Sequence, residues 1–166
     1  VFWGKEAKYF TKNGAARAIL EWFTDHNVTM HVTTRDTIPD LPPNVVQNGL
    51  LSSEDFRVLL AESRFLVGLG DPIQGPTVLE AAAAACMFFN PHFPTKKYLS
   101  GRDAETSSQH APVENETFTC NYELDTPSTL EPCLTRAMSL DLPFDVPAKF
   151  TEQAIVQRLT PLFPLS

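Results

Sequence analysis

The residues best suited to chemistry lie in the stretch VGLGDPIQGPTVLEAAAAACMFFNP, residues 67–91. An apolar run ends there in a loop that contains Gly70 and Gly75 and leads into Pro76. Glycine has no Cβ, so the backbone at these positions can come close to a ligand. Proline is favoured in the first turn of a helix, because the N–H that it lacks has no partner there. The pattern predicts a loop that contacts a ligand and leads directly into a helix.

The start of that helix would supply the groups that hold the ligand. Free N–H groups of Thr77, Val78 and Leu79 would point out of the helix and, with its dipole, favour a diphosphate. Glu80 follows within the first turn, where its carboxylate can accept hydrogen bonds from neighbouring hydroxyls of a sugar. Together these groups predict a site for a nucleotide sugar. The same residues also fit an ordinary strand–helix junction, because the dipole alone favours a glutamate in the first turn.

Motifs for several other kinds of chemistry are missing from the sequence. No G-x-G-x-x-G follows the first apolar run, which argues against a dinucleotide cofactor, and no G-x-S-x-G marks a nucleophile. The cysteines do not have the spacing of metal ligands, and the histidines are scattered. His92 and His110 fall near the candidate site, but such residues are more often structural or superficial than catalytic. We therefore predict no metal and no covalent nucleophile.

The cysteines and two glycosylation triplets bear on the compartment. Cys86 comes at the end of the alanine-rich run, where a small buried hydrophobic residue is expected. Cys120 and Cys133 could pair in a lumenal protein, and two buried thiols would fit equally well. The triplets Asn27-Val-Thr29 and Asn115-Glu-Thr117 favour a secretory compartment. Residue patterns alone leave both the pairing and the compartment open.

Apolar patterns along the chain predict the elements that position the candidate site. One-sided apolar stripes predict helices over 14–26, 52–64, 77–86, 128–138 and 151–159, the second of them capped by Ser52 and Asp55. Short apolar runs predict strands at 1–4, 28–32, 45–51, 65–69, 87–89 and 118–124, with a polar loop over 90–116. This alternation predicts an α/β fold with a Rossmann-like parallel sheet and helices on both faces. Ligands bind outside the carboxyl ends of the strands of such a sheet, where the loop 70–76 would lie.

Composition and charge limit the possible partners. With 166 residues, of which 43% are hydrophobic, the chain suits one domain with a sizeable core. The net charge is −7 and no basic run occurs, so neither nucleic acid nor direct contact with an anionic membrane is expected. No signal peptide and no membrane-spanning apolar run is apparent. The chain starts without Met inside the apolar run VFWG, and we expect it to be a piece of a longer polypeptide.

Short motifs in a fixed order connect this chain to a known family. They are VFWGK at 1–5, NGLLS at 48–52, FLVGLG at 65–70, GP at 75–76, LEA at 79–81, Cys86, FNPHF at 89–93, SQH at 108–110, FT at 150–151 and QR at 157–158. They strongly resemble the donor-binding half of the α-1,6-mannosylglycoprotein 6-β-N-acetylglucosaminyltransferase family. The resemblance is densest from Gly49 to Phe93. Its GP and LE pairs are shared loosely by many GT-B glycosyltransferases, whereas NPHF and SQH are more specific to this family.

The resemblance implies an inverting, metal-independent GT-B enzyme with two Rossmann-like halves. Residues 1–166 would form the second half, the nucleotide-sugar donor-binding domain. The whole enzyme would move N-acetylglucosamine from UDP-GlcNAc to the 6-hydroxyl of an α-1,6-linked mannose on N-glycans. The general base and the acceptor site would lie in the other half, so this chain alone would be inactive. The family also implies the Golgi lumen, within a single-pass type II membrane protein whose anchor lies outside this chain.

Carried over by position, the resemblance assigns roles to residues of the donor site. Glu80 would bind the ribose hydroxyls, and the turn of Asn48, Gly49 and Leu50 would lie near the uracil. The backbone of Gly75, Pro76, Thr77 and Val78 would face the diphosphate, and Gly70, Gln74 and Arg102 complete the set.

Three departures from the family pattern matter. Gln74 stands where the family has an acidic residue, so one donor contact loses its charge. Arg102 replaces a lysine and keeps the charge, and residues 111–148 match poorly. A non-catalytic or degenerate nucleotide-sugar-binding domain is therefore an alternative, as is an α/β domain for another nucleotide.

Overall fold

The computed structural model describes residues 1–3, 7–10, 15–69, 75–93 and 108–139. These residues form one six-stranded sheet in which neighbouring strands are parallel. Its strands are β1 (Phe2–Trp3), β2 (Met30–Thr33), β3 (Val45–Gln47), β4 (Phe65–Val67), β5 (Met87–His92) and β6 (Thr119–Glu123). Their order across the sheet, β3-β2-β1-β4-β5-β6, is that of the Rossmann fold. The predicted α/β fold with a Rossmann-like parallel sheet is confirmed.

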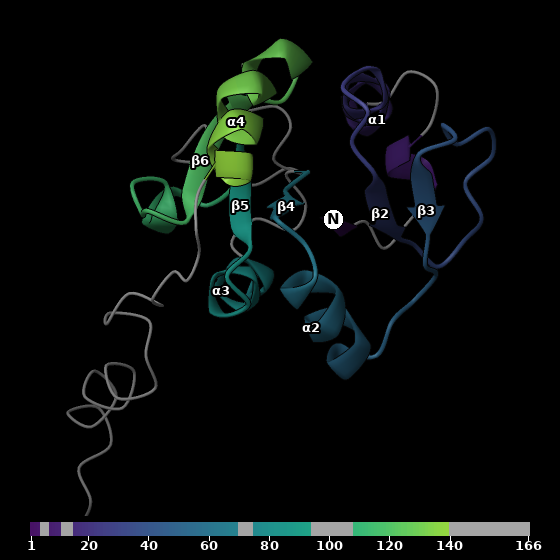
Figure 1. The fold of residues 1–166 in the computed structure, drawn as a ribbon, viewed down its shortest axis with the longest axis horizontal. Coiled ribbons are helices and arrows are strands. Elements are labelled where there is room, and N and C mark those ends of the chain that lie inside the picture. Colours follow the sequence, from purple (N-terminus) through teal and green to yellow (C-terminus); the bar gives the residue numbers. More distant parts are fainter. Residues whose placement is uncertain (4–6, 11–14, 70–74, 94–107, 140–166) are drawn as a thin grey trace, which may run out of the picture.

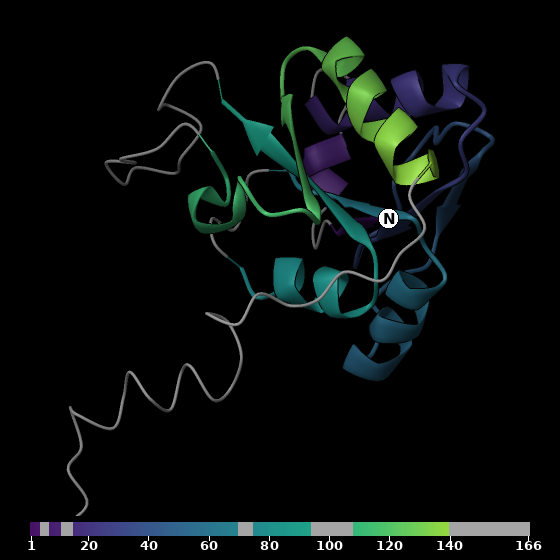
Figure 2. The same cartoon turned by 60° about the vertical axis from the view of Figure 1, so that its left-hand side comes forward.

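Helices cover both faces of this sheet (Figures 1 and 2). The described α-helices are α1 (Ala15–Asp25), α2 (Ser53–Ala61), α3 (Thr77–Ala83) and α4 (Glu131–Ser139), and the 3₁₀ helices are η1 (Ala7–Phe10), η3 (Ala111–Val113) and η4 (Pro127–Leu130). Side chains of α1 and α4 share one hydrophobic core, and those of α2 and α3 share the other. Because successive side chains of a strand point to opposite faces, β4 supplies both cores: Phe65 and Val67 enter the first and Leu66 the second.

Two helix ends show how the local sequence sets the boundaries. The predicted cap of α2 is confirmed, since the N–H of Asp55 donates to Oγ of Ser52 at 3.1 Å. The helix predicted over 77–86 ends at Ala83 instead. Ala85 takes a left-handed conformation with φ of 58°, and the N–H of Cys86 donates to the carbonyl of Ala81 at 2.8 Å. This closure is a Schellman motif in which alanine occupies the position that glycine usually fills.

The polar loop predicted from Asn90 was wrong at its start. Strand β5 continues to His92 and pairs with β6 from Phe88 to His92. Asn90 is fully buried there, because its side chain is satisfied by hydrogen bonds to Ser108 at 2.7 Å and to Asn121 at 2.9 Å. The helix predicted over 128–138 is present as η4 followed by α4. The helix predicted over 151–159 lies outside the described residues.

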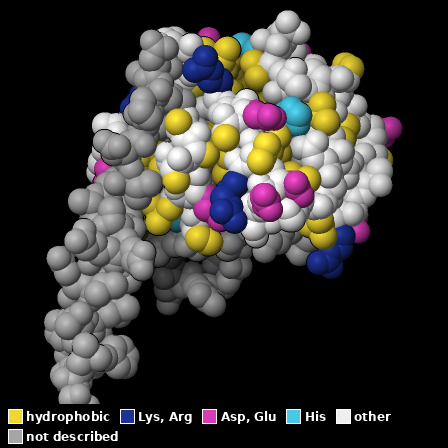
Figure 3. Space-filling model, turned by 60° about the horizontal axis from the view of Figure 1, so that its bottom comes forward, with side chains coloured by type: hydrophobic (Ala, Val, Ile, Leu, Met, Phe, Trp, Pro, Cys, Tyr) yellow, Lys and Arg dark blue, Asp and Glu magenta, His cyan; other side chains and the backbone are white. Residues whose placement is uncertain are grey.

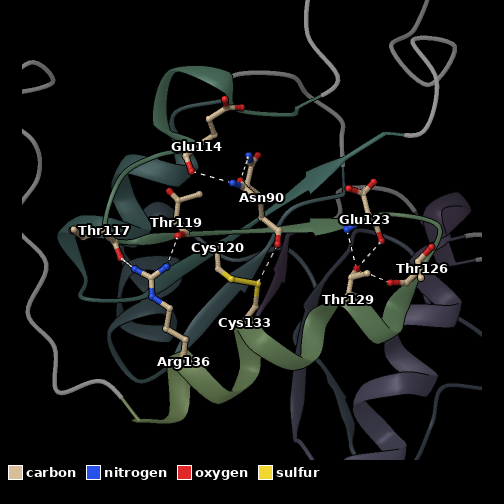
Figure 4. Close-up of a disulfide and its surroundings, with 11 residues drawn as sticks. Asn90, Glu114, Thr117, Thr119, Cys120, Glu123, Thr126, Thr129, Cys133 and Arg136 are labelled. Carbon is tan, nitrogen blue, oxygen red and sulfur yellow. Dashed lines mark hydrogen bonds between the residues drawn. A yellow bond between two sulfur atoms is a disulfide. The ribbon is translucent and has the colours of Figure 1, made fainter.

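A disulfide joins the last described helix to the edge of the sheet. Cys120 of β6 and Cys133 of α4 are bonded (Figure 4), which settles the question that their spacing left open. In the same region, the guanidinium of Arg136 donates to the carbonyl oxygens of Thr117 and Thr119. Cys86 is a buried free thiol, as predicted. Helix α4 is therefore held against β6 by a covalent bond as well as by packing.

The outer surface agrees with the composition. Figure 3 shows acidic and basic side chains interspersed with apolar ones over the described part of the face that lies at the bottom of Figure 1. Within the described ranges, no helix is both long enough and apolar enough to span a bilayer.

Candidate functional site

The predicted ligand loop lies at the point where the strand order reverses. β1 and β4 are neighbours in the middle of the sheet, with Phe2 paired to Val67. In a sheet of this order, ligands bind outside the carboxyl ends of the strands at that point. Residues 68 and 69 leave the carboxyl end of β4, and residues 75 and 76 lead into α3. Gly70 and Gln74 belong to this loop by sequence but lie outside the described residues, as does Arg102.

The start of α3 matches the prediction except at one amide. Pro76 directly precedes the helix and already has helical angles, with φ of −67° and ψ of −18°. The N–H of Leu79 donates to the carbonyl of Pro76 at 2.9 Å, so the prediction that this amide is free was wrong. In this tight first turn, the amides of Thr77 and Val78 have no hydrogen-bond acceptor within the helix. Glu80 is half-buried in that turn.

The predicted uracil turn is formed at a different strand. Asn48 follows β3, and its N–H donates to the carbonyl of Val32 at 2.9 Å. Gly49 has φ of 69°, and the side chain of Leu50 is 58% exposed. Two strands separate β3 from β4, which at normal sheet spacing is a distance of roughly 14 Å. The turn and α3 therefore lie at the same edge of the sheet without meeting.

A turn that the sequence did not assign to the site packs beside α3. Ser108 pairs with His92 of β5, and the N–H of Gln109 donates to the carbonyl of Pro91 at 3.0 Å. The N–H of His110 donates to the buried side-chain oxygen of Asn90 at 3.0 Å. These bonds fix Ser108, Gln109 and His110, which we call the 108–110 turn, over the carboxyl end of β5.

The 108–110 turn and α3 enclose a small pocket of about 20 Å³. Its walls are residues 66–69, Gly75, Thr77, Val78, Phe88, Gln109 and His110. The ring of His110 meets that of Phe88 edge-on, with centroids 5.6 Å apart. At the base of the loop, the hydroxyl of Tyr122 donates to the carbonyl of Gly68 at 2.6 Å. Two of the predicted backbone contacts, Gly75 and Val78, thus line the same pocket as the unassigned turn.

Burial sets the charge of the pocket. It lowers the pKa of His110 to about 4, and a hydrogen bond to the backbone of Gly75 opposes this effect. His110 is therefore neutral at physiological pH, and none of the other lining residues carries a charge. The side chain of His110 is only 6% exposed. This burial agrees with the expectation that a structural role is more common for such a histidine than a catalytic one. His92 lies outside the pocket, with Nε2 4.0 Å from a carboxylate oxygen of Glu114.

The described residues hold no cluster that could bind a metal through three or more His, Cys, Asp or Glu side chains. What the pocket and the adjoining helix start offer is uncharged: backbone amides, an amide and an imidazole side chain, and an apolar floor. One carboxylate, Glu80, lies in the same first turn of α3. This set can bind a ligand through hydrogen bonds, but it contains no nucleophile with an adjacent base.

Comparison with known proteins identifies the family. The sequence model of glycosyltransferase family 18 matches residues 1–164. The chain belongs to glycosyltransferase family 18. Among the curated family members, the human protein named alpha-1,6-mannosylglycoprotein 6-beta-N-acetylglucosaminyltransferase A is 26% identical over 95% of this chain and 22% of its own length. The mouse protein named alpha-1,6-mannosylglycoprotein 6-beta-N-acetylglucosaminyltransferase B is 30% identical over 69% of this chain and 16% of its own length. A Caenorhabditis elegans relative with the same name and no final letter is 29% identical over 80% of this chain and 22% of its own length.

This family 18 chain spans about a fifth of the length of the relatives that match it over most of its residues. The match runs almost from end to end of the chain, so it includes the poorly matching segment 111–148 as well as the 108–110 turn. The resemblance noted from the short motifs is thereby confirmed at the level of the family. The family motif SQH forms the 108–110 turn, and the motif FNPHF covers the end of strand β5, whose Asn90 anchors that turn.

Proposed function

We propose that this chain is the donor-binding half of an inverting GT-B glycosyltransferase. The complete enzyme moves N-acetylglucosamine from UDP-GlcNAc to the 6-hydroxyl of an α-1,6-linked mannose on N-glycans. The observation that carries this proposal is the match of family 18 to residues 1–164, on a chain whose Rossmann-like sheet places the loop before Glu80 at the reversal of strand order. The names of the relatives support the choice of donor sugar and linkage.

Each part of the donor has a proposed partner. Glu80 accepts hydrogen bonds from the ribose hydroxyls, and the backbone from Gly75 to Val78 faces the diphosphate. The turn of Asn48, Gly49 and Leu50 lies near the uracil. The distance of roughly 14 Å between β3 and β4 supports this division, because it requires an elongated ligand that runs along the carboxyl edge of the sheet. Arg102, Gln74 and Gly70 are proposed donor contacts on the family resemblance alone.

The chemistry divides between the two halves. A general base in the acceptor half removes the proton of the mannose 6-hydroxyl, whose oxygen attacks the anomeric carbon as the bond to the diphosphate breaks. The charge that develops on the departing UDP is stabilised here by backbone amides and Arg102, with no metal required. We expect the isolated chain to bind donor and to transfer no sugar.

The disulfide bears on location. A bond between Cys120 and Cys133 is typical of an oxidising compartment. It supports the proposal that the protein works in the Golgi lumen, as part of a type II membrane protein whose anchor lies outside this chain.

One departure favours a second candidate. Gln74 replaces an acidic residue of the family pattern, so a domain that binds nucleotide sugars without catalysing transfer is the alternative. Restoring the acidic residue distinguishes the two: in the complete protein, Gln74→Glu should create transfer activity if the natural protein has none. Activity of the natural protein would instead exclude the alternative.

Calorimetry tests donor binding on the chain itself. We expect UDP and UDP-GlcNAc to bind more tightly than GDP and ADP. Glu80→Gln should weaken the binding of UDP by about 1–3 kcal/mol, because the ribose hydroxyls lose a charged acceptor. Glu54→Gln on α2 is the matched control, since Glu54 is exposed and lies on another helix. A chain with no preference for UDP at millimolar concentration refutes the proposed function.

A further inference from the structure

The pocket between α3 and the 108–110 turn has a chemical character that the proposed donor contacts do not explain. Val78 and Phe88 belong to the second hydrophobic core, and His110 packs edge-on against Phe88, but the proposed donor contacts use none of these three side chains. Val78 and Phe88 are each 3% exposed and line the pocket, so together they form an apolar floor. His110 forms part of the wall and is 6% exposed. A pocket of this kind selects for one small group.

We propose that this pocket binds the acetamido group of the donor sugar, an inference that rests on the proposed function. The methyl group would lie on the floor formed by Val78 and Phe88. The amide of the group would meet the polar wall formed by Thr77 and the 108–110 turn. The pocket would thus distinguish UDP-GlcNAc from UDP-glucose, which has a hydroxyl in place of the acetamido group.

The size of the pocket supports this assignment. A volume of about 20 Å³ holds one or two water-sized groups, since one such group needs about 10–15 Å³ on this measure. The methyl and the carbonyl of an acetamido group are of that size. A sugar ring, with six ring atoms, is too large for this space.

The charge of the pocket points the same way. His110 is the one titratable group among its lining residues, and burial keeps it neutral at physiological pH. A pocket without a cation gives no compensation for a buried phosphate. A neutral imidazole that donates through one ring nitrogen to the carbonyl of Gly75 has an acceptor at the other nitrogen. An amide N–H is a suitable donor to it.

The wall is held firmly enough to discriminate. Asn90 is completely buried and binds both ends of the 108–110 turn, at Ser108 and at the N–H of His110. Gly68 makes room for Gln109, because a Cβ at position 68 would lie 2.2 Å from Oε1 of Gln109. A site held in place from several sides rejects a mismatched group more strongly than one that can adapt.

A ligand series on the unaltered chain tests the proposal without any risk of misfolding. Calorimetry would compare UDP, UDP-glucose, UDP-GlcNAc and the N-butanoyl analogue of UDP-GlcNAc. We expect UDP-GlcNAc to bind about tenfold more tightly than UDP-glucose, the effect of one well-fitted apolar group. The N-butanoyl analogue should lose this advantage, because two further carbons exceed the space. Equal affinity for UDP-glucose and UDP-GlcNAc, or for the two N-acyl sugars, would overturn the proposal.

Variants then locate the effect. Val78→Ile adds one methyl group at the floor and should remove the preference for UDP-GlcNAc over UDP-glucose, with a smaller loss of affinity for UDP itself. Val58→Ile makes the same change on the exposed face of α2, where Val58 is 53% exposed, and should change neither value. An equal loss for all three ligands in Val78→Ile would show that the pocket does not read the acetamido group. A chain that does not bind even UDP would refute the proposed function, and this proposal with it, whereas UDP binding without sugar preference refutes this proposal alone.

Discussion

Gly68 provides the sharpest test of how the candidate site is built. An alanine Cβ at this position would lie 2.2 Å from Oε1 of Gln109, 2.9 Å from Cδ of Pro91 and 3.0 Å from Cζ of Phe88. Carbon atoms in good contact are about 3.5–4.0 Å apart. The Gln109 amide could rotate away, but the two rings cannot, because Pro91 is part of β5 and the Phe88 ring packs against His110. We therefore expect Gly68→Ala to lower the free energy of unfolding by about 2–3 kcal/mol, the upper range for overpacking.

Gly49→Ala is the matched control for this change. Nothing lies within 4 Å of a Cβ at Gly49, but φ there is +69°. The backbone strain of about 1–2 kcal/mol is partly offset by about 0.4–1 kcal/mol from the lower entropy of the unfolded chain. Gly49→Ala should therefore cost between about 0 and 1.6 kcal/mol, and Gly68→Ala clearly more.

Urea unfolding followed by circular dichroism measures both variants, and a cycle with Gln109→Ala identifies the contact. Removing the Gln109 side chain should relieve part of the cost of Gly68→Ala, with a coupling of about 1 kcal/mol, as is typical of residues in contact. If Gly68→Ala costs no more than Gly49→Ala, or if the cycle shows no coupling, the turn does not pack on Gly68 as described here.

Three further predictions concern stability. Ala85→Gly should stabilise the chain by about 1 kcal/mol, because glycine removes the strain of a left-handed Cβ at the end of α3. The control Ala83→Gly, at the last residue of α3, should destabilise it by up to about 1 kcal/mol, and thermal melts that rank the two otherwise would contradict this. Replacing both Cys120 and Cys133 by alanine should cost about 3 kcal/mol, because the bond closes a loop between residues 13 apart; addition of dithiothreitol should destabilise only the natural chain in the same urea assay. Burial lowers the pKa of His110 from 6.5 to about 4, so the unfolded chain takes up this proton first as the pH falls. The contribution of His110 to the free energy of unfolding is fully present above pH 6.5 and falls by up to about 3 kcal/mol as the pH decreases toward 4. His110→Gln should therefore lose less stability than the natural chain between pH 7 and pH 4.5. An identical loss in both proteins would refute a neutral buried imidazole.

The fold could be predicted because its signals are local. Short apolar runs marked the strands, and the stripes of α1 and α2 marked amphipathic helices. The continuous apolar run at 65–69 indicated a strand buried on both faces, and Phe65 and Leu66 do enter opposite cores. The order of six parallel strands then follows from two right-handed halves that diverge from the middle of the sheet.

The site could be predicted only in part, because half of its wall depends on contacts between distant residues. Asn90 is of a type that is common in loops, and its burial in β5 depends on side-chain hydrogen bonds to the distant residues Ser108 and His110. The disulfide was equally hidden, since a spacing of 13 residues fits a bond or two thiols. Ala85 gave no signal at all, because its conformation follows from the closure of α3 and not from its type. The family motifs FNPHF and SQH were the available clue to the 108–110 turn.

If the pocket binds the acetamido group as proposed, two tasks along a nucleotide sugar are separated. A group that carries no charge can be held by shape and hydrogen bonds, and the neutral His110, the floor at Val78 and Phe88, and the firmly held turn supply both. A diphosphate needs compensation that this pocket lacks, so in the proposed donor site it would bind outside the pocket, toward the first amides of α3 and Arg102. Sugar selectivity and nucleotide affinity would then arise from different sides of the start of α3. This division explains why one helical turn contains both a glutamate, Glu80, and an apolar residue of the pocket floor, Val78.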